Sequence, residues 1–318
     1  PHFRPGGVFR GLDLQVSERK VDSPAYQFAL FSDTHLAPDG RAEWMNVKMD
    51  RAAAPELSAA LQALAREGMA FALLAGDMTD RGTRECFAML ADVLASTDLP
   101  VYGCIGNHDS YRVSSRPDVL ELCGGLFPEG KTDYVLSRPP LRFVVLDASY
   151  WRTRDGRILE SYDAKQAAGI GLRPEQTEWL RRTLAEETRT PTVVVWHYGF
   201  ISRGGLSSCG YKLPGSTCVN SKEVVGILDA APNVVATLCG HSHWNEVNRV
   251  GQITHVQNPG FVEWPNAYRV FRVYPDRLEW ETRQAGNRGF VRESFIPPKA
   301  LAWMLSTGDG DLAGEIRF

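Results

Sequence analysis

The stretch FALLAGDMTDRG, residues 71–82, begins as an apolar run and turns polar at Asp77. Similar apolar runs lie on either side of it, YQFALFS at 26–32 and LPVYGCIG at 99–106. The segments between them space their apolar residues as amphipathic helices do: 54–68 and 83–97. Because apolar strands that alternate with helices are typical of a sheet covered on both faces, these residues predict a layered α/β domain.

The second half of the chain is richer in predicted strands. Further apolar runs predict strands at 141–147, 191–197, 233–240, 252–257 and 268–275. Helical spacing recurs at 173–187 and 221–231. The stretches 148–172 and 199–220 show no clear period, so we expect two long loops, which in compact enzymes are usually functional.

The composition is that of a globular protein. The chain has 318 residues, of which 43% are hydrophobic and 23% charged, and this excludes a disordered chain. A net charge of −3 argues against a dedicated nucleic-acid binder, and no apolar run reaches the roughly 18 residues of a membrane span. We expect an irregular leader over 1–25, one main domain over 26–285, and a C-terminal extension over 286–318 that packs on that domain or on a neighbour.

The compartment and one disulfide stay open at this point. A cytoplasmic location is favoured, and a secreted or periplasmic one is the alternative if a signal peptide was removed before Pro1. The six cysteines form no CxxC pair, which argues against a zinc ribbon. Cys209 and Cys218 flank a turn-rich segment and could close a small disulfide loop.

Polar side chains gather where five of the predicted strands end. The segments are SDTH (32–35), AGDMTDRG (75–82), IGNHD (105–109), VVVWH (193–197) and CGHSH (239–243). Strand ends are where α/β sheets build their sites. An isolated buried charge is costly. The presence of this many polar side chains at strand ends therefore indicates that they belong to one common site.

These segments supply seven candidate metal ligands. They are Asp33, His35, Asp77, Asn107, His197, His241 and His243. Imidazoles and carboxylates suit Mn, Fe, Zn or Co. Seven ligands are too many for one closed zinc site and about right for two ions that share a carboxylate, for which Asp77 is the candidate. Such two-metal sites serve in-line displacement at phosphorus.

In their order along the chain, the motifs D-x-H, G-D-x-x-D-R-G, G-N-H-D, a lone H and G-H-x-H resemble those of the calcineurin-like metallophosphoesterase superfamily. The GNHD motif and the segment LRPEQTEWLRRTL resemble its class III cyclic nucleotide phosphodiesterase and glycerophosphodiesterase branch. That branch often has H-H-P-P at the lone histidine, where this chain has WHYG at 196–199. The resemblance implies a four-layer αββα sandwich with two stacked mixed β-sheets flanked by helices, and a metallophosphoesterase domain over 26–285.

The resemblance also implies two divalent or trivalent metal ions, with Fe, Mn, Zn and Co all left open. The first metal would be held by Asp33, His35, Asp77 and His243, and the second by Asp77, Asn107, His197 and His241. His108 would face the substrate as a proton donor, and we expect Asp109 to orient its imidazole and keep it cationic. The implied reaction is in-line attack on a small phosphodiester by a hydroxide that bridges the two cations.

A phosphodiesterase is the favoured interpretation. A phosphomonoesterase is the alternative, because the sequence does not show whether a second ester group fits the pocket. A non-catalytic scaffold would lack ligands, whereas all seven positions are filled; a nuclease is disfavoured by the net charge. We expect a small phosphoester substrate and no nucleic-acid partner, and leave a homo-oligomer open.

Some residues near the motifs have two possible roles. Trp44, Trp151 and Trp244 could stack a base or aryl leaving group, or pack a loop onto the domain. We expect Trp44, Trp244 and Tyr198 to bind substrate. Asp80 could contact substrate or form an ion pair near the site, whereas Asp147 is expected to have a structural role.

Overall fold

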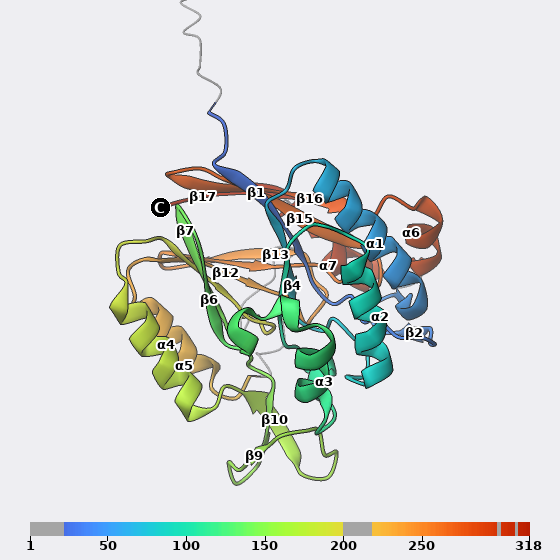
Figure 1. Cartoon of the computed structure of the whole chain (residues 1–318), viewed down its shortest axis with the longest axis horizontal. Coiled ribbons are helices and arrows are strands. Elements are labelled where there is room, and N and C mark those ends of the chain that lie inside the picture. The colour runs from blue at the N-terminus through green and yellow to red at the C-terminus, as the bar shows by residue number, and fades with distance from the viewer. Residues whose placement is uncertain (1–21, 200–217, 298–299, 309–310) are drawn as a thin grey trace, which may run out of the picture.

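The computed structural model describes residues 22–199, 218–297, 300–308 and 311–318. Within these ranges, two six-stranded sheets lie between two sets of helices. The helices α1 (Asp50–Arg66) and α2 (Arg84–Ala95) lie on one side, and α4 (Pro174–Glu186) and α5 (Ser221–Asp229) on the other (Figure 1). The predicted four-layer sandwich is therefore confirmed.

The first sheet holds the amino-terminal motif strands at its centre and edge. Its order is β17-β16-β15-β1-β4-β5. The bounds are β1 (Tyr26–Phe31), β4 (Phe71–Ala75), β5 (Val101–Cys104), β15 (Ala267–Val273), β16 (Arg277–Gln284) and β17 (Ala313–Arg317). Strands β1, β4 and β5 are parallel, so their carboxyl ends meet at one edge of the sheet. Strand β17 makes residues of the C-terminal segment part of this sheet.

The second sheet is also mixed and also has six strands. Its order is β13-β14-β12-β11-β7-β6. The bounds are β6 (Tyr134–Arg138), β7 (Leu141–Val145), β11 (Thr192–Val195), β12 (Val234–Cys239), β13 (Glu246–Val250) and β14 (Ile253–Gln257). The four central strands are parallel, and β6 and β13 are antiparallel edges. The two central strands β11 and β12 carry the lone histidine and the GHSH segment at their carboxyl ends.

Aromatic side chains join the two sheets. The Phe28 ring stacks on Phe71 and Phe271 within the first sheet, at centroid distances of 5.0 and 4.8 Å. Its edge meets Phe143 of the second sheet at 5.3 Å. All of these side chains are fully buried. This packing fixes one sheet against the other and so fixes the relative positions of the loops at their ends.

Several short helices and strands were not predicted from the spacing of apolar residues. The predicted loop at 148–172 contains instead a small sheet of β8 (Tyr150–Thr153), β9 (Ile158–Leu159) and β10 (Ala167–Gly171). The other short elements are β2 (Ala42–Glu43), β3 (Val47–Lys48), α3 (Ser115–Leu122), α6 (Arg288–Ser294), α7 (Ala300–Thr307), and the 3₁₀ turns η1 (His108–Ser110), η2 (Gly124–Leu126) and η3 (Pro128–Gly130). Strands this short contain too few residues to show an alternating pattern.

Two further expectations concern the second predicted loop and membrane spans. Residues 200–217 of the second predicted loop, including Cys209, lie outside the described residues, so its disulfide to Cys218 stays a prediction. In the ranges that are described, every helix is too short or too polar to cross a membrane.

Candidate metal centre

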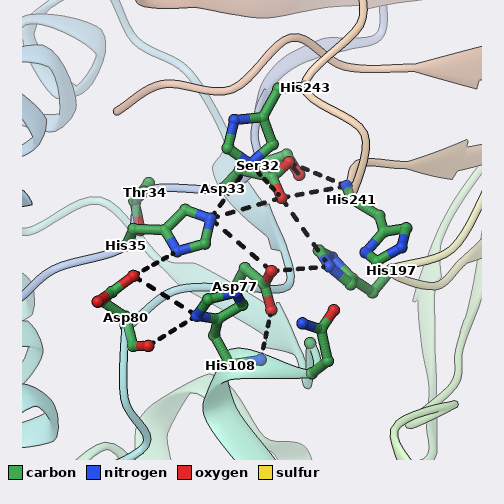
Figure 2. Close-up of polar contacts among 12 residues, drawn as sticks. Ser32, Asp33, Thr34, His35, Asp77, Asp80, His108, His197, His241 and His243 are labelled. Carbon is green, nitrogen blue, oxygen red and sulfur yellow. Dashed lines mark hydrogen bonds and ion pairs between the residues drawn. The ribbon is translucent and has the colours of Figure 1, made fainter. Parts of the chain in front are cut away.

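The loops that follow β1, β4, β11 and β12 bring their polar side chains to one place, where Figure 2 shows them converging. In one group, Asp33 Oδ1 lies 3.4 Å from His243 Nε2, and the Nε2 atoms of His35 and His243 lie 3.2 Å apart. Two facing imidazole nitrogens can share only one proton, whereas a metal ion accepts both lone pairs. Asp33, His35 and His243 therefore offer a set of donors suited to a cation.

Asp77 connects this group to a second one. Its Oδ2 lies 3.1 Å from His197 Nε2 and 3.7 Å from His35 Nε2. Asp77, His197 and His241 form the second cluster of converging donors. One carboxylate oxygen thus faces donors of both groups, as a bridging ligand would.

Asn107 adds a neutral oxygen beside the carboxylates. In the described part of the chain its Oδ1 is buried without a hydrogen-bond partner. Because a buried polar atom without a partner is costly, this orphan oxygen fits a position where a cation binds. The structure therefore brings together all seven residues that the sequence singled out as ligands.

The outer nitrogens of three imidazoles are occupied by partners that turn the inner ones toward the centre. His243 Nδ1 donates to Glu263 Oε1 (2.6 Å), and His197 Nδ1 donates to the Ala75 carbonyl (2.8 Å). His35 Nδ1 lies 3.2 Å from Asp80 Oδ1. Such partners orient metal-binding histidines and raise their basicity. Glu263 was missed by sequence analysis, although a lone acid in the apolar stretch NPGFVEW could have been a signal.

The backbone is strained at these residues. Of the seven described residues other than glycine with positive φ, five are Asp33, His35, Asp77, His241 and His243. This conformation is uncommon for residues with a Cβ and tends to occur at functional sites. The strain is thus concentrated in the predicted ligands.

Glycines in the motifs give the ligands room. A Cβ on Gly106 would collide with the Asp77 carboxylate, and one on Gly240 would collide with Ser32 and Asp33. The glycine that precedes Asn107 and the one that precedes His241 are therefore needed for close approach of the strands' ends.

This order of motifs on this fold matches a known family. The model of the calcineurin-like phosphoesterase family matches residues 26–245. The chain belongs to this family. A "probable cyclic nucleotide phosphodiesterase" of Synechococcus sp. is 24% identical over 270 residues, which are 82% of this chain and 92% of that protein. A glycerophosphodiester phosphodiesterase of Enterobacter lignolyticus is 23% identical over 210 residues, 64% of this chain and 67% of that protein.

A solved structure supports the fold. A dimetal phosphatase from Danio rerio aligns with a TM-score of 0.65 at 18% identity, covering 83% of this chain and 97% of that one. Together with the family match, the relatives confirm the prediction of a metal-dependent phosphoester hydrolase.

Charge is divided unevenly among the candidate ligands of this phosphoesterase. Burial alone would raise the pKa of Asp33, but His243 and His197 lower it to about 2. Burial alone would lower the pKa of His243, but Asp33 and Glu263 raise it to about 10. Burial and the neighbouring His197 lower the pKa of His241 to about 4. Histidines in one buried site cannot all be protonated, so some lone pairs are available to a metal.

Asp80, and not Asp109, contacts the imidazole of His108. His108 Nδ1 donates to the Asp80 carbonyl (2.7 Å) and lies 3.5 Å from its carboxylate. The buried Asp109 carboxylate instead accepts three backbone N–H groups, those of Met78, Thr79 and Gly106. The orienting task expected of Asp109 therefore falls to Asp80, while Asp109 ties two motif loops together. Asp80 also pairs with Lys48, which agrees with the ion-pair interpretation.

A cleft of about 240 Å³ opens over these residues. It is lined by His35, Ala42, Glu43, Trp44, Lys48, Asp77, Asn107, His108, His241 and His243. The Trp44 side chain lines this cleft and is 62% exposed, so its position is compatible with the expected substrate contact.

The other two residues expected to bind substrate have different surroundings. Tyr198 is fully buried, with its ring against His197 and His241 and its hydroxyl 3.2 Å from Ser149 Oγ. Trp244 is buried in a cluster with Leu305 and Met45. Both expectations are corrected: although these residues are adjacent in sequence to candidate ligands, their side chains are buried and do not line the cleft.

Proposed function

We propose that this phosphoesterase is a two-metal phosphodiesterase that acts on small phosphodiesters. The observation that carries the proposal is the position of the Asp77 carboxylate between two buried donor groups at the floor of the cleft. The names of the two relatives described above, both phosphodiesterases, support the choice of a diester.

The charge of the cleft also favours a diester. A phosphodiester carries one negative charge, whereas a monoester carries nearly two near neutral pH. Among the described lining residues, Lys48 is the single lysine or arginine, and its ammonium pairs with Asp80. Glu43 adds a carboxylate to the same lining. Apart from the His108 imidazole, the described lining thus offers little positive side-chain charge to compensate a second phosphate charge.

The donor sets indicate which residues would hold the metals. Asp33, His35, Asp77 and His243 would hold one, and Asp77, Asn107, His197 and His241 the other. When bound, the cations would supply the Lewis-acid chemistry that polarises the phosphoryl group and activates water. Glu263 and the Ala75 carbonyl would keep two of the imidazoles aimed inward.

His108 is the candidate proton donor to the leaving oxygen. Burial alone would lower its pKa, but Asp77 and Asp80 outweigh burial and raise it, which favours the protonated ring. The Asp80 carbonyl holds its Nδ1–H, so that Nε2–H is left to face the cleft, where a quarter of the side chain (25%) is exposed. A protonated imidazole in this place can deliver a proton to an alkoxide as it leaves.

The test is paired turnover of an aryl phosphodiester and the matching aryl monoester by protein reloaded with Mn²⁺, with a chelated control. We expect a higher kcat/KM for the diester and no turnover after chelation. Preference for the monoester would establish the phosphomonoesterase alternative instead. Absence of turnover of both esters with Mn²⁺, Zn²⁺, Fe²⁺ and Co²⁺ would overturn the proposal.

A further inference from the structure

A cluster of aromatic rings continues outward from His108. The Tyr111 ring lies 4.8 Å from the His108 ring, centroid to centroid. Trp151 stacks on Tyr111 at 6.0 Å with an interplanar angle of 27°. Tyr162 lies 5.6 Å from Tyr111 and 4.7 Å from Trp151. We refer to Tyr111, Trp151 and Tyr162 as the aromatic platform.

Three separate segments build the aromatic platform. Tyr111 follows directly after η1, the turn that begins with His108. Trp151 lies on β8, and Tyr162 lies between β9 and β10, in the small sheet near α3 (Figure 1). The Tyr162 N–H donates to the Tyr111 carbonyl (3.3 Å), which attaches this sheet to the histidine turn. This hydrogen bond and the ring contacts place the platform next to His108.

The platform is a surface and not a sealed core. Tyr162 is 46% exposed, and Tyr111 and Trp151 are half-buried. Exposing a large aromatic side chain gives up burial energy, and aromatic side chains are common in ligand contacts. The platform adjoins the cleft through Tyr111, whose ring contacts the cleft residue His108. The rings also contact one another, so no gap is left between them for a caged quaternary ammonium group, whereas a flat ring can lie on their open side.

We propose that the aromatic platform is a subsite that stacks a planar ring in the leaving group of the substrate. The proposal rests on the phosphodiesterase function, because His108 lines the cleft and an ester group of a bound diester that extends past His108 meets the platform next. From there the next surface is Tyr111, followed by Trp151 and Tyr162. Base–aromatic stacking tolerates different ring types, so both a nucleobase and an aryl group satisfy the same chemistry.

The test compares phosphodiesters that differ only in the leaving group: adenosine, phenol, choline and methanol. The variants are Tyr162→Leu, which removes the exposed ring, and Tyr162→Phe, which keeps it. Tyr111 is left unchanged because its side chain hydrogen-bonds Asn107, a candidate metal ligand. Trp179→Leu is the matched control, since this half-buried ring lies on α4 in a separate groove.

We expect Tyr162→Leu to raise the KM for the adenosine and phenyl diesters about tenfold, the lower range for loss of one stacking contact. The choline and methyl diesters should change little, and Tyr162→Phe and Trp179→Leu should behave as the unchanged chain. A loss confined to the adenosine diester identifies a nucleobase, and one shared with the phenyl diester identifies any flat ring. The proposed subsite would be overturned if Tyr162→Leu raised the KM equally for planar and non-planar diesters, or raised it most for the choline diester.

Calorimetric titration with adenosine 5′-phosphate and with glycerol phosphate separates this inference from the proposed function. If diesters are not hydrolysed but Tyr162→Leu weakens adenosine phosphate binding alone, the function fails and the subsite stands. If diesters are hydrolysed and Tyr162→Leu changes neither binding nor KM, the subsite fails and the function stands.

Discussion

Two pairs of carboxylates lie at strand ends in this phosphoesterase, and their surroundings differ. Asp33 and Asp77 face the Nε2 atoms of His35, His197 and His243, at distances of 3.1–4.0 Å. In the second pair, Asp147 receives two hydrogen bonds from Arg116 (2.8 and 3.0 Å).

The fourth acid, Asp133, is half-buried. It accepts hydrogen bonds from the Gln176 amide, at 2.8 Å to each oxygen, and from the Asp147 N–H (2.9 Å). Burial and the neighbouring Asp147 raise the pKa of Asp133 to about 7. The difference teaches that position at a strand end does not make a metal site. Fixed donors such as guanidinium occupy a carboxylate permanently, whereas an imidazole nitrogen can exchange its proton for a cation.

The sharpest test of this contrast, with the largest expected effect, replaces one acid of each pair by its amide. Asp77→Asn should lower kcat/KM by about 10³-fold or more and reduce bound metal, because a neutral amide is a poor bridge between two cations. Asp147→Asn should keep its metal but lose about 3 kcal/mol of unfolding free energy, since Arg116 loses its charged partner. Metal analysis and urea unfolding measure the two effects, and equal metal loss in both variants would erase the contrast.

Replacing His108, the proposed proton donor, separates chemistry from metal binding at the first pair. His108→Ala should keep the metal content and lower turnover of diesters with poor leaving groups by about 10²-fold, with a smaller loss for good leaving groups. The measurement is kcat for a series of leaving groups of rising pKa. The same loss across the series would argue against proton donation.

A smaller effect on metal affinity is expected at Glu263, which contacts a candidate ligand but is not one itself. Glu263→Gln removes the negative charge that holds His243 Nδ1–H, so metal affinity should fall by about tenfold. Competition with a chromogenic chelator measures the affinity. Glu315→Gln on the edge strand β17 is the control and should have no effect. Unchanged affinity in Glu263→Gln would show that backbone packing alone orients the ring.

The smallest effect concerns the pH dependence of stability at the second pair. A carboxyl whose pKa is raised in the folded chain contributes stability at low pH, and this contribution is lost as the pH rises from about 4 to about 7. Asp133→Asn should therefore gain stability relative to the unchanged chain between pH 5 and pH 8. Urea unfolding at both values, with chelator present, measures the difference. A pH-independent difference would place the raised pKa on another group.

Much of the site was predictable because its parts are local in sequence. Each candidate ligand follows an apolar strand within a few residues, and the five motifs together, in their order along the chain, are specific although each is weak alone. Glu263 and the role of Asp80 were not predictable in this way. Glu263 meets a ligand 20 positions away, and Asp80 meets His35 across 45 positions, with no motif to mark either contact.

The sequence by itself determined the central strands, most helices and the seven candidate ligands, because burial and strand ends leave a local pattern of apolar and polar residues. Tertiary structure alone decided which donors face one another. The imidazoles of His35 and His243, 208 positions apart, meet because the two sheets are packed face to face. It also decided that Tyr198 lies behind the ligands and that Trp151 lies beside His108's neighbour Tyr111. Packing between distant segments sets these contacts, and no local pattern records them.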